Sequence, residues 1–225
     1  MDKINQTIQT LITNLKPIKP RKLIFTYYLM LFISSLLIIV ISITFLSIRN
    51  DLNSQLKSIF FWLEWITILS TLLSLIYYLI ALTIPGLAIK KTKIILYSSI
   101  SLWGLLLINS IIKTVTQSTK TLFYLDPYFS CAIIISALMI LSSLILRQCL
   151  DNKTIFNKKK YLYIIVLSGA FIGFVVVNLY CPITHPTHII LWHLIPILII
   201  PFLVTKTIHL LQKQTKHNQK KHYKQ

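Results

Sequence analysis

The chain has little glycine and very little acid. Only four of its 225 residues are glycine, and only five are aspartate or glutamate. Four scattered glycines provide neither a glycine-rich phosphate-binding loop nor a flexible linker. No two carboxylates are placed as a catalytic acid–base pair, and no nucleophile elbow occurs. The sequence therefore carries no positive sign of an enzyme, and we expect none.

Charge of either sign is also scarce. Charged residues make up 12% of the chain, whereas a soluble domain carries roughly 25%. Hydrophobic residues make up 55%, and the mean hydropathy is +0.73. No proline-rich tract and no internal repeat divides the chain. The composition therefore predicts one membrane domain with short polar tails.

Long apolar runs define that domain. A spanning helix needs about 20 apolar residues, and six runs reach or approach this length. The sequence thus predicts an all-α, polytopic bundle of six transmembrane helices over residues 23–205. An N-terminal segment, 1–22, precedes it and a basic tail, 206–225, follows it. The runs are Ile24–Ile48, Ile59–Leu82, Ile94–Ile112, Tyr128–Leu146, Tyr161–Tyr180 and Ile189–Thr205.

Basic residues are distributed unevenly between the two sides of this bundle. Nineteen of the 23 lysines and arginines lie in the two tails and in the second and fourth connections. The positive-inside rule then places both termini in the cytoplasm. The net charge of +18 thus sets topology and attracts anionic lipid headgroups, and we expect no nucleic-acid partner. The four exceptions are Arg49, Lys57, Lys113 and Lys120.

The N-terminal segment has an apolar stripe at helical spacing. A helix of about 15 residues, ended by Pro17, must bury that stripe in the headgroup layer, in the bundle or on a partner protein. Its polar face carries mainly Asn, Gln and Thr, whereas membrane-surface helices are rich in Lys and Arg, which favours the partner slightly. The stripe consists of Ile4, Ile8, Leu11, Ile12 and Leu15.

The stretch Tyr180–His193 concentrates metal-binding side chains between the last two spans. It contains a cysteine, three of the six histidines and no charged residue. Thiolate and imidazole suit zinc, copper(I) and related ions, although the spacing matches no standard zinc motif. The alternative is that the histidines are rim residues bonded to backbone or lipid headgroups. The candidate ligands are Cys181, His185, His188 and His193.

The other cysteines are divided between the two sides. Cys131 lies near the outer end of the fourth span, on the same side as Cys181, whereas Cys149 lies near the inner end. An oxidising outer compartment permits a Cys131–Cys181 disulfide, provided that the Cα atoms approach within about 7 Å. The sequence leaves that pairing open.

Two features inside the predicted spans are an acidic residue and a pair of glycines. Glu64 is an acidic residue inside a span, and we expect it to reach the outer interface or to pair with Lys57 or Arg49. Gly169 and Gly173 form a small-xxx-small pair, which is typical of close helix packing. A proton-driven transporter would carry more intramembrane charge or broken, glycine-rich helices.

Several short landmarks then follow in one order along most of the chain. In this order and spacing, the sequence resembles the NrsF-type family of six-helix membrane anti-sigma factors, the negative regulators of sigma F. The landmarks are LKPIKP (Leu15–Pro20), RNDL (Arg49–Leu52), IPG (Ile84–Gly86), Cys131, LR (Leu146–Arg147), Gly169 with Gly173, YCP (Tyr180–Pro182) and WH (Trp192–His193).

The resemblance implies a function. Members hold an extracytoplasmic-function sigma factor at the bacterial inner membrane through the N-terminal segment and release it on an outer metal or oxidative signal. Two outer cysteines sense that signal, and by position they correspond to Cys131 and Cys181. Cys149 does not match, and Asn50 stands where the family more usually has proline. The alternative function is a small metal-handling transporter that uses Cys181, His185, His188 and His193.

Overall fold

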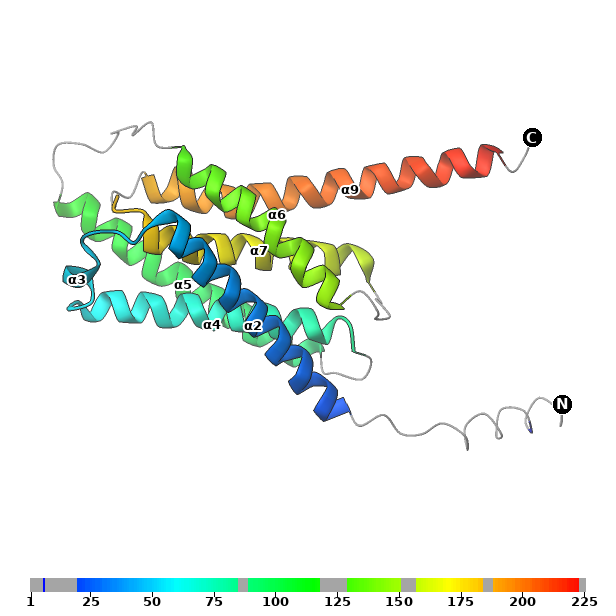
Figure 1. The fold of residues 1–225 in the computed structure, drawn as a ribbon, viewed down its shortest axis with the longest axis horizontal. Coiled ribbons are helices and arrows are strands. Elements are labelled where there is room, and N and C mark those ends of the chain that lie inside the picture. The colour runs from blue at the N-terminus through cyan, green and yellow to red at the C-terminus, as the bar shows by residue number, and fades with distance from the viewer. Residues whose placement is uncertain are drawn as a thin grey trace.

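The computed structural model describes residues 6, 20–84, 89–117, 129–150, 157–183 and 188–222. Over these ranges the chain is helical and contains no strand (Figure 1). The predicted N-terminal stripe lies outside the described residues. The elements are α2 (Pro20–Leu46), α3 (Leu52–Gln55), α4 (Ile59–Ala81), α5 (Ile89–Gln117), α6 (Ser130–Leu150), α7 (Lys158–Tyr180), the π-helical turn η1 (Ile189–Leu194) and α9 (Ile195–His222).

Six of these helices are long and apolar enough to cross a membrane, which confirms the predicted all-α, six-span architecture. The last span is continuous with α9, which runs on to His222, so the predicted basic tail is helical to that residue. The orientation with both termini inside stays a prediction. The candidate spans are Ile24–Leu46, Ile59–Ala81, Ile89–Asn109, Ser130–Leu150, Lys158–Tyr180 and Ile189–Leu211.

Local chemistry explains several helix ends. α2 begins at Pro20, whose fixed φ and missing N–H are tolerated in a first helical turn. α7 begins after Asn157, whose side-chain oxygen accepts a hydrogen bond from the backbone N–H of Lys160 at 3.0 Å. α2 ends before Ser47, which has a φ of 58°, a left-handed conformation that is uncommon outside glycine.

Helix α7 is the centre of the bundle (Figure 1). Its span is 72% buried, far more than any other span, and it packs against α2, α4, α6 and α9. Phe174 is fully enclosed and contacts Trp103 of α5 edge-on, with ring centroids 5.2 Å apart. Because α7 is apolar on all sides, it belongs in the interior, whereas the outer helices need bury only one face.

The outer helices present apolar side chains to their surroundings. Phe45 is 85% exposed and Leu105 is 64% exposed, which suits lipid contact. Serine and threonine hydroxyls are satisfied within their own helices, as when Ser42 donates to the Ile38 carbonyl at 2.7 Å. The start of α2 and the end of α9 project from the same end of the bundle (Figure 1).

Candidate metal centre

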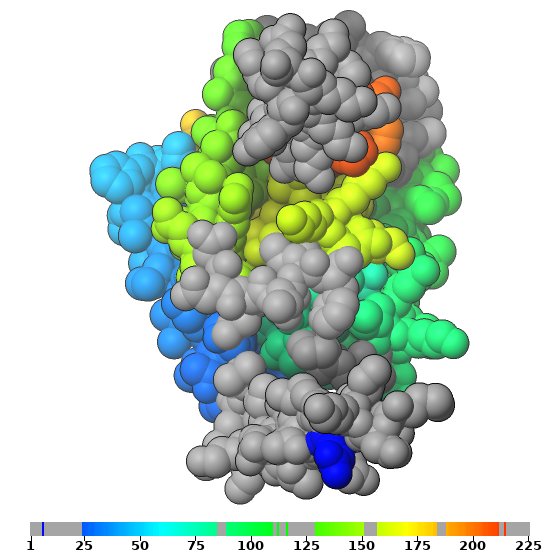
Figure 2. Space-filling view, turned by 90° about the vertical axis from the view of Figure 1, so that its right-hand side faces the viewer, coloured from blue at the N-terminus to red at the C-terminus, as the bar shows by residue number. Residues whose placement is uncertain are grey.

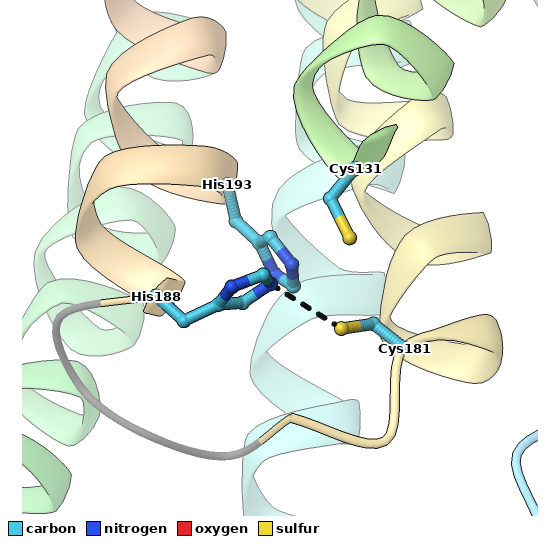
Figure 3. Close-up of side chains that lie close together, drawn as sticks. All are labelled: Cys131, Cys181, His188 and His193. Carbon is cyan, nitrogen blue, oxygen red and sulfur yellow. Dashed lines mark hydrogen bonds between the residues drawn. The ribbon is translucent and has the colours of Figure 1, made fainter. Parts of the chain in front are cut away.

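Two cysteines and two histidines meet at the opposite end of the bundle. Cys131 lies in the first turn of α6, Cys181 directly follows α7, His188 precedes η1 and His193 lies within it. The four side chains point toward one another (Figure 3), and their sulfur and nitrogen ligand atoms all lie within 4.8 Å of one another. Each of the four residues is only 2% or 3% exposed. A buried four-ligand cluster is therefore built from three helical elements.

The π-helical turn η1 pairs the two histidines. His188 and His193 are five residues apart, and five residues of α-helix advance about 1.4 turns, which would point the two side chains to different faces. A π-helix closes its hydrogen bonds between residues i and i+5, so residues five apart return to nearly the same side. The two imidazole rings accordingly lie 5.1 Å apart between centroids.

Pro196, in the first turn of α9, accounts for this wide turn. Proline has no backbone N–H, and its ring clashes with the carbonyl four residues earlier, which here belongs to Trp192. A widened turn just before the proline relieves the clash, and π turns of this kind are frequent at functional sites. The pairing of the histidines thus follows from a proline outside the cluster.

The two cysteines meet because α6 and α7 pack closely. These helices form the most extensive helix pair in the described residues. A Cβ atom added at Gly169 would lie 2.6 Å from the Met139 carbonyl oxygen, and one at Gly173 would lie 3.0 Å from that of Ile135. The predicted role of this glycine pair in helix packing is therefore confirmed. Ile135 lies one turn from Cys131, so the close approach continues to the cluster.

Cys181 is the most polarised member of the cluster. Its Sγ lies 3.4 Å from Nε2 of His188. The pKa of the Cys181 thiol is lowered, first because the Cys131 thiol donates a hydrogen bond to it and further because His193 is near, while burial opposes both effects. Since the thiolate is the form that binds metals and attacks electrophiles, this environment prepares Cys181 for either chemistry.

His193 is buried with its polar atoms unsatisfied. Neither of its ring nitrogens has a hydrogen-bond partner among the described residues, so it acts on Cys181 by proximity. A buried polar group left unpaired costs about 1–3 kcal/mol. Such an unpaired group in a folded protein calls for an explanation. A metal ion bound by one ring nitrogen would explain it, and the neighbouring thiols are suitable ligands for the same ion.

The donor set suits a tetrahedral ion of soft or borderline character. Zinc binds sulfur at about 2.3 Å and imidazole nitrogen at about 2.0–2.1 Å, so the ligand atoms around it are about 3.3–3.8 Å apart. The four atoms here lie within 4.8 Å, so the widest pair would close by about 1 Å. Two thiolates and a divalent cation also sum to zero charge, which a buried site favours.

A cavity of about 490 Å³ adjoins the cluster and provides access to both cysteines. Its wall includes Arg49, whose guanidinium holds Asp51 through two hydrogen bonds of 2.6 and 2.5 Å. The Arg49 backbone N–H donates to the Leu179 carbonyl at 3.0 Å. The RNDL landmark is therefore bonded to the residue that precedes YCP, and both landmarks line the cavity beside the cluster.

The structure unites three of the four predicted metal ligands, Cys181, His188 and His193. It adds Cys131, which the sequence marked for sensing but not as a metal ligand. His188 and His193 are each 2% exposed, which disfavours the alternative that they bond lipid headgroups. His185 lies outside the described residues.

Cys149 and Glu64 lie apart from the cluster. Cys149 is 18 residues from Cys131 along α6, a rise of about 27 Å. Glu64 is half-buried in α4, and within the described ranges no ion pair reaches it, because Arg49 pairs with Asp51. Arg49 still attracts the Glu64 carboxylate electrostatically. The predicted pairing of Glu64 with Lys57 or Arg49 is thus not formed as a direct contact.

The fold and the cluster define a class, that of six-span helical membrane proteins with a buried thiol–imidazole centre. Within it, the family model of NrsF, the negative regulator of sigma F, matches residues 11–207. The chain belongs to this family, as its landmarks indicated, and is therefore related to proteins that restrain a sigma factor. No curated protein and no solved structure matches it.

Proposed function

We propose that this protein is an inner-membrane anti-sigma factor. It holds an extracytoplasmic-function sigma factor through its N-terminal segment, 1–22, at the cytoplasmic face. It releases that factor when a metal ion or an oxidant acts on Cys131 and Cys181 from the outer side. The observation that carries this proposal is the buried thiol–imidazole cluster at the end of the bundle opposite to the start of α2.

Family membership supports the regulatory part of the proposal. It favours a sigma-factor partner over metal transport by the same ligands. Six candidate spans support location in a membrane, and the excess of basic residues on one side supports an orientation with both termini inside. The apolar stripe then faces the compartment in which a sigma factor is found.

A transition-metal ion is the signal that this cluster is best suited to receive. Binding by two thiolates and two imidazoles is worth about 10–16 kcal/mol in small structural zinc sites. A 100-fold weaker grip on the sigma factor needs only about 2.8 kcal/mol. If a third of the binding free energy differed between the state that holds the sigma factor and the state that releases it, the ion would supply enough.

The path from the cluster to the sigma-binding segment runs through α2. Ligation draws the ends of α6, α7 and α9 together by up to about 1 Å. The end of α7 is bonded to the loop after α2 through Arg49 and Leu179. α2 has 27 residues, about 40 Å of rigid helix, and it leads directly back to the N-terminal segment. A shift at Cys181 is therefore passed to the far side of the membrane by a packed element.

Metal binding is tested by titrating the solubilised, reduced protein with Co²⁺, whose thiolate complexes absorb in the near ultraviolet. We expect one ion per chain in the wild type and no thiolate band in a Cys131→Ser, Cys181→Ser double variant. Cys149→Ser is the matched control and should bind as the wild type does. An unchanged titration in the double variant would refute the site.

Sigma-factor docking is tested separately, by co-purification of the full chain with extracytoplasmic-function sigma factors of the same organism. Replacing Ile8 and Leu11 with aspartate should abolish co-purification while leaving Co²⁺ binding intact. Adding a thiol-binding metal should release the sigma factor from the wild type but not from the Cys131→Ser, Cys181→Ser variant. Retention of the sigma factor by the aspartate variant would contradict the docking segment without touching the metal site.

A further inference from the structure

A second cavity lies at the other end of the bundle, where α5 and α7 begin. It has a volume of about 780 Å³, which is within the range of pockets that bind small ligands. Its walls come from α4, α5, α7 and α9. Figure 2 views the molecule from this end, with α7 (yellow) at the centre, between α2 (blue) on one side and α5 (green) on the other. None of the four residues of the metal centre lines this cavity.

The mouth of the cavity is basic. Four lysines from three helices line it, together with a histidine, and among the residues that the structure describes no carboxylate does. The amino group of Lys93 lies 5.3 Å from the centroid of the Tyr97 ring, so an aromatic face holds one of these cations in place. Four like charges around one opening repel each other unless an anion lies between them. The basic lining residues are Lys93, Lys159, Lys160, Lys206 and His209.

The interior of the cavity is apolar. α5 packs against α4 and makes no extensive contact with α9, so the two helices flank an opening over α7. Phe202 is 57% exposed on one side of this opening, whereas Leu96 on the other is buried. A soluble anion such as phosphate gains nothing from such a wall, but an acyl chain does. The apolar lining includes Leu96, Ile100, Ile164, Leu167 and Phe202.

We propose that this cavity binds an anionic phospholipid. Its headgroup phosphate lies among the lysines of α5, α7 and α9, and one acyl chain lies along the apolar wall between α5 and α9. Basic pockets between transmembrane helices on the cytoplasmic side bind acidic lipids in this way. Charge disfavours the protein's own N-terminal segment as the occupant, because its ionised side chains other than Asp2 are basic.

The test uses the full chain in lipid nanodiscs or mixed micelles. Native mass spectrometry counts the phosphatidylglycerol molecules that stay bound, with phosphatidylcholine as the neutral comparison. We expect one retained phosphatidylglycerol and no retained phosphatidylcholine. Because each lysine near an acidic headgroup contributes about 1 kcal/mol, a Lys93→Gln, Lys206→Gln variant should bind about 25-fold more weakly.

The matched control is Lys90→Gln, Lys91→Gln, which removes the same charge from exposed positions on the same helix. It should retain the lipid as the wild type does. An equal loss in both double variants would show a general surface attraction and would overturn the proposal. Ile100→Trp, which fills the apolar part without changing charge, should also displace the lipid.

A competition experiment distinguishes a lipid site from a site for free phosphate. Inorganic phosphate at millimolar concentration should leave the retained phosphatidylglycerol in place, because it cannot replace the acyl-chain contacts. Displacement by phosphate, or retention of the lipid by the Ile100→Trp variant, would mean that the cavity is no lipid site.

Discussion

A single methyl group at Gly169 should separate α6 from α7. The Cβ atom of an alanine at this position would lie 2.5 Å from Ser143 Oγ and 2.6 Å from the Met139 carbonyl oxygen, whereas ordinary contact begins near 3.4 Å. The serine side chain can rotate, but the carbonyl belongs to the helix backbone. The helices must therefore move apart by about 0.8 Å at this level, a gap that forfeits a quarter to a half of the local dispersion energy.

The magnitude follows from two opposing effects. Overpacking of this kind costs about 1–3 kcal/mol. Replacing a helical glycine by alanine returns about 0.5–1 kcal/mol of backbone entropy. Gly104, in α5, has nothing within 4 Å of its added Cβ, so alanine there brings the gain in backbone entropy without any overpacking. Because the entropy gain is common to both alanine variants, their free energies of unfolding should differ by the overpacking cost alone, about 1–3 kcal/mol.

The assay is reversible unfolding of the purified protein in mixed micelles with increasing dodecyl sulfate. Gly169→Ala should unfold at a lower detergent fraction than the wild type, and Gly104→Ala at an equal or higher one. Gly169→Ala should also bind Co²⁺ more weakly, because the same helix pair positions Cys131 and Cys181. Equal unfolding of the two alanine variants would refute the close approach of α6 and α7.

Three further outcomes follow from the cluster and its surroundings. The rate at which iodoacetamide alkylates Cys181 should change little between pH 6 and 8, because the lowered pKa keeps its thiolate present. A thiol of ordinary pKa reacts about tenfold more slowly for each pH unit below about 8.5. A tenfold fall in rate per pH unit at Cys181 would contradict the lowered pKa. Asp51 has a pKa lowered by its hydrogen bonds from Arg49, so this pair stabilises the fold above about pH 4 and the gain is lost as the pH falls through the lowered pKa. Since Asp51 is 37% exposed, solvent screening limits that gain to a few tenths of a kcal/mol. Arg49→Gln should unfold slightly earlier than the wild type at pH 7, and the difference should shrink as Asp51 is protonated. His193→Leu should leave the metal-free protein at least as stable as the wild type while abolishing its stabilisation by Co²⁺, and a large loss of metal-free stability would show that His193 has only a packing role.

The spans were predictable because they rest on run length alone. Each apolar run in the sequence became one helix, and the differences lie at the ends. α9 continues past the predicted limit at Thr205 because lysine, glutamine and leucine, which are good helix formers, make up most of residues 206–222. Pro201 lies inside this helix without ending it, as prolines in membrane helices can.

The geometry of the cluster was less predictable, because it depends on contacts between elements. Cys131 and Cys181 are 50 residues apart, and the predicted topology placed them on a shared side without showing that they meet. Spacing on an ideal helix separates His188 from His193, and it is the π turn before Pro196 that reunites them. A proline a few residues after a pair of histidines five apart is the signal in the sequence that could have indicated this.

The origin of the four ligands explains why such a centre suits a signalling protein. A site confined to one loop could bind an ion without changing anything else. Here Cys131 belongs to α6, Cys181 to the end of α7, and the two histidines to the turn that begins α9. Any ion or bond that joins them must fix three helices relative to one another, and α7 contacts nearly every other span. Metal binding at the centre and the arrangement of the whole bundle are therefore coupled equilibria. The affinity of a partner that binds one arrangement would change when the ion binds.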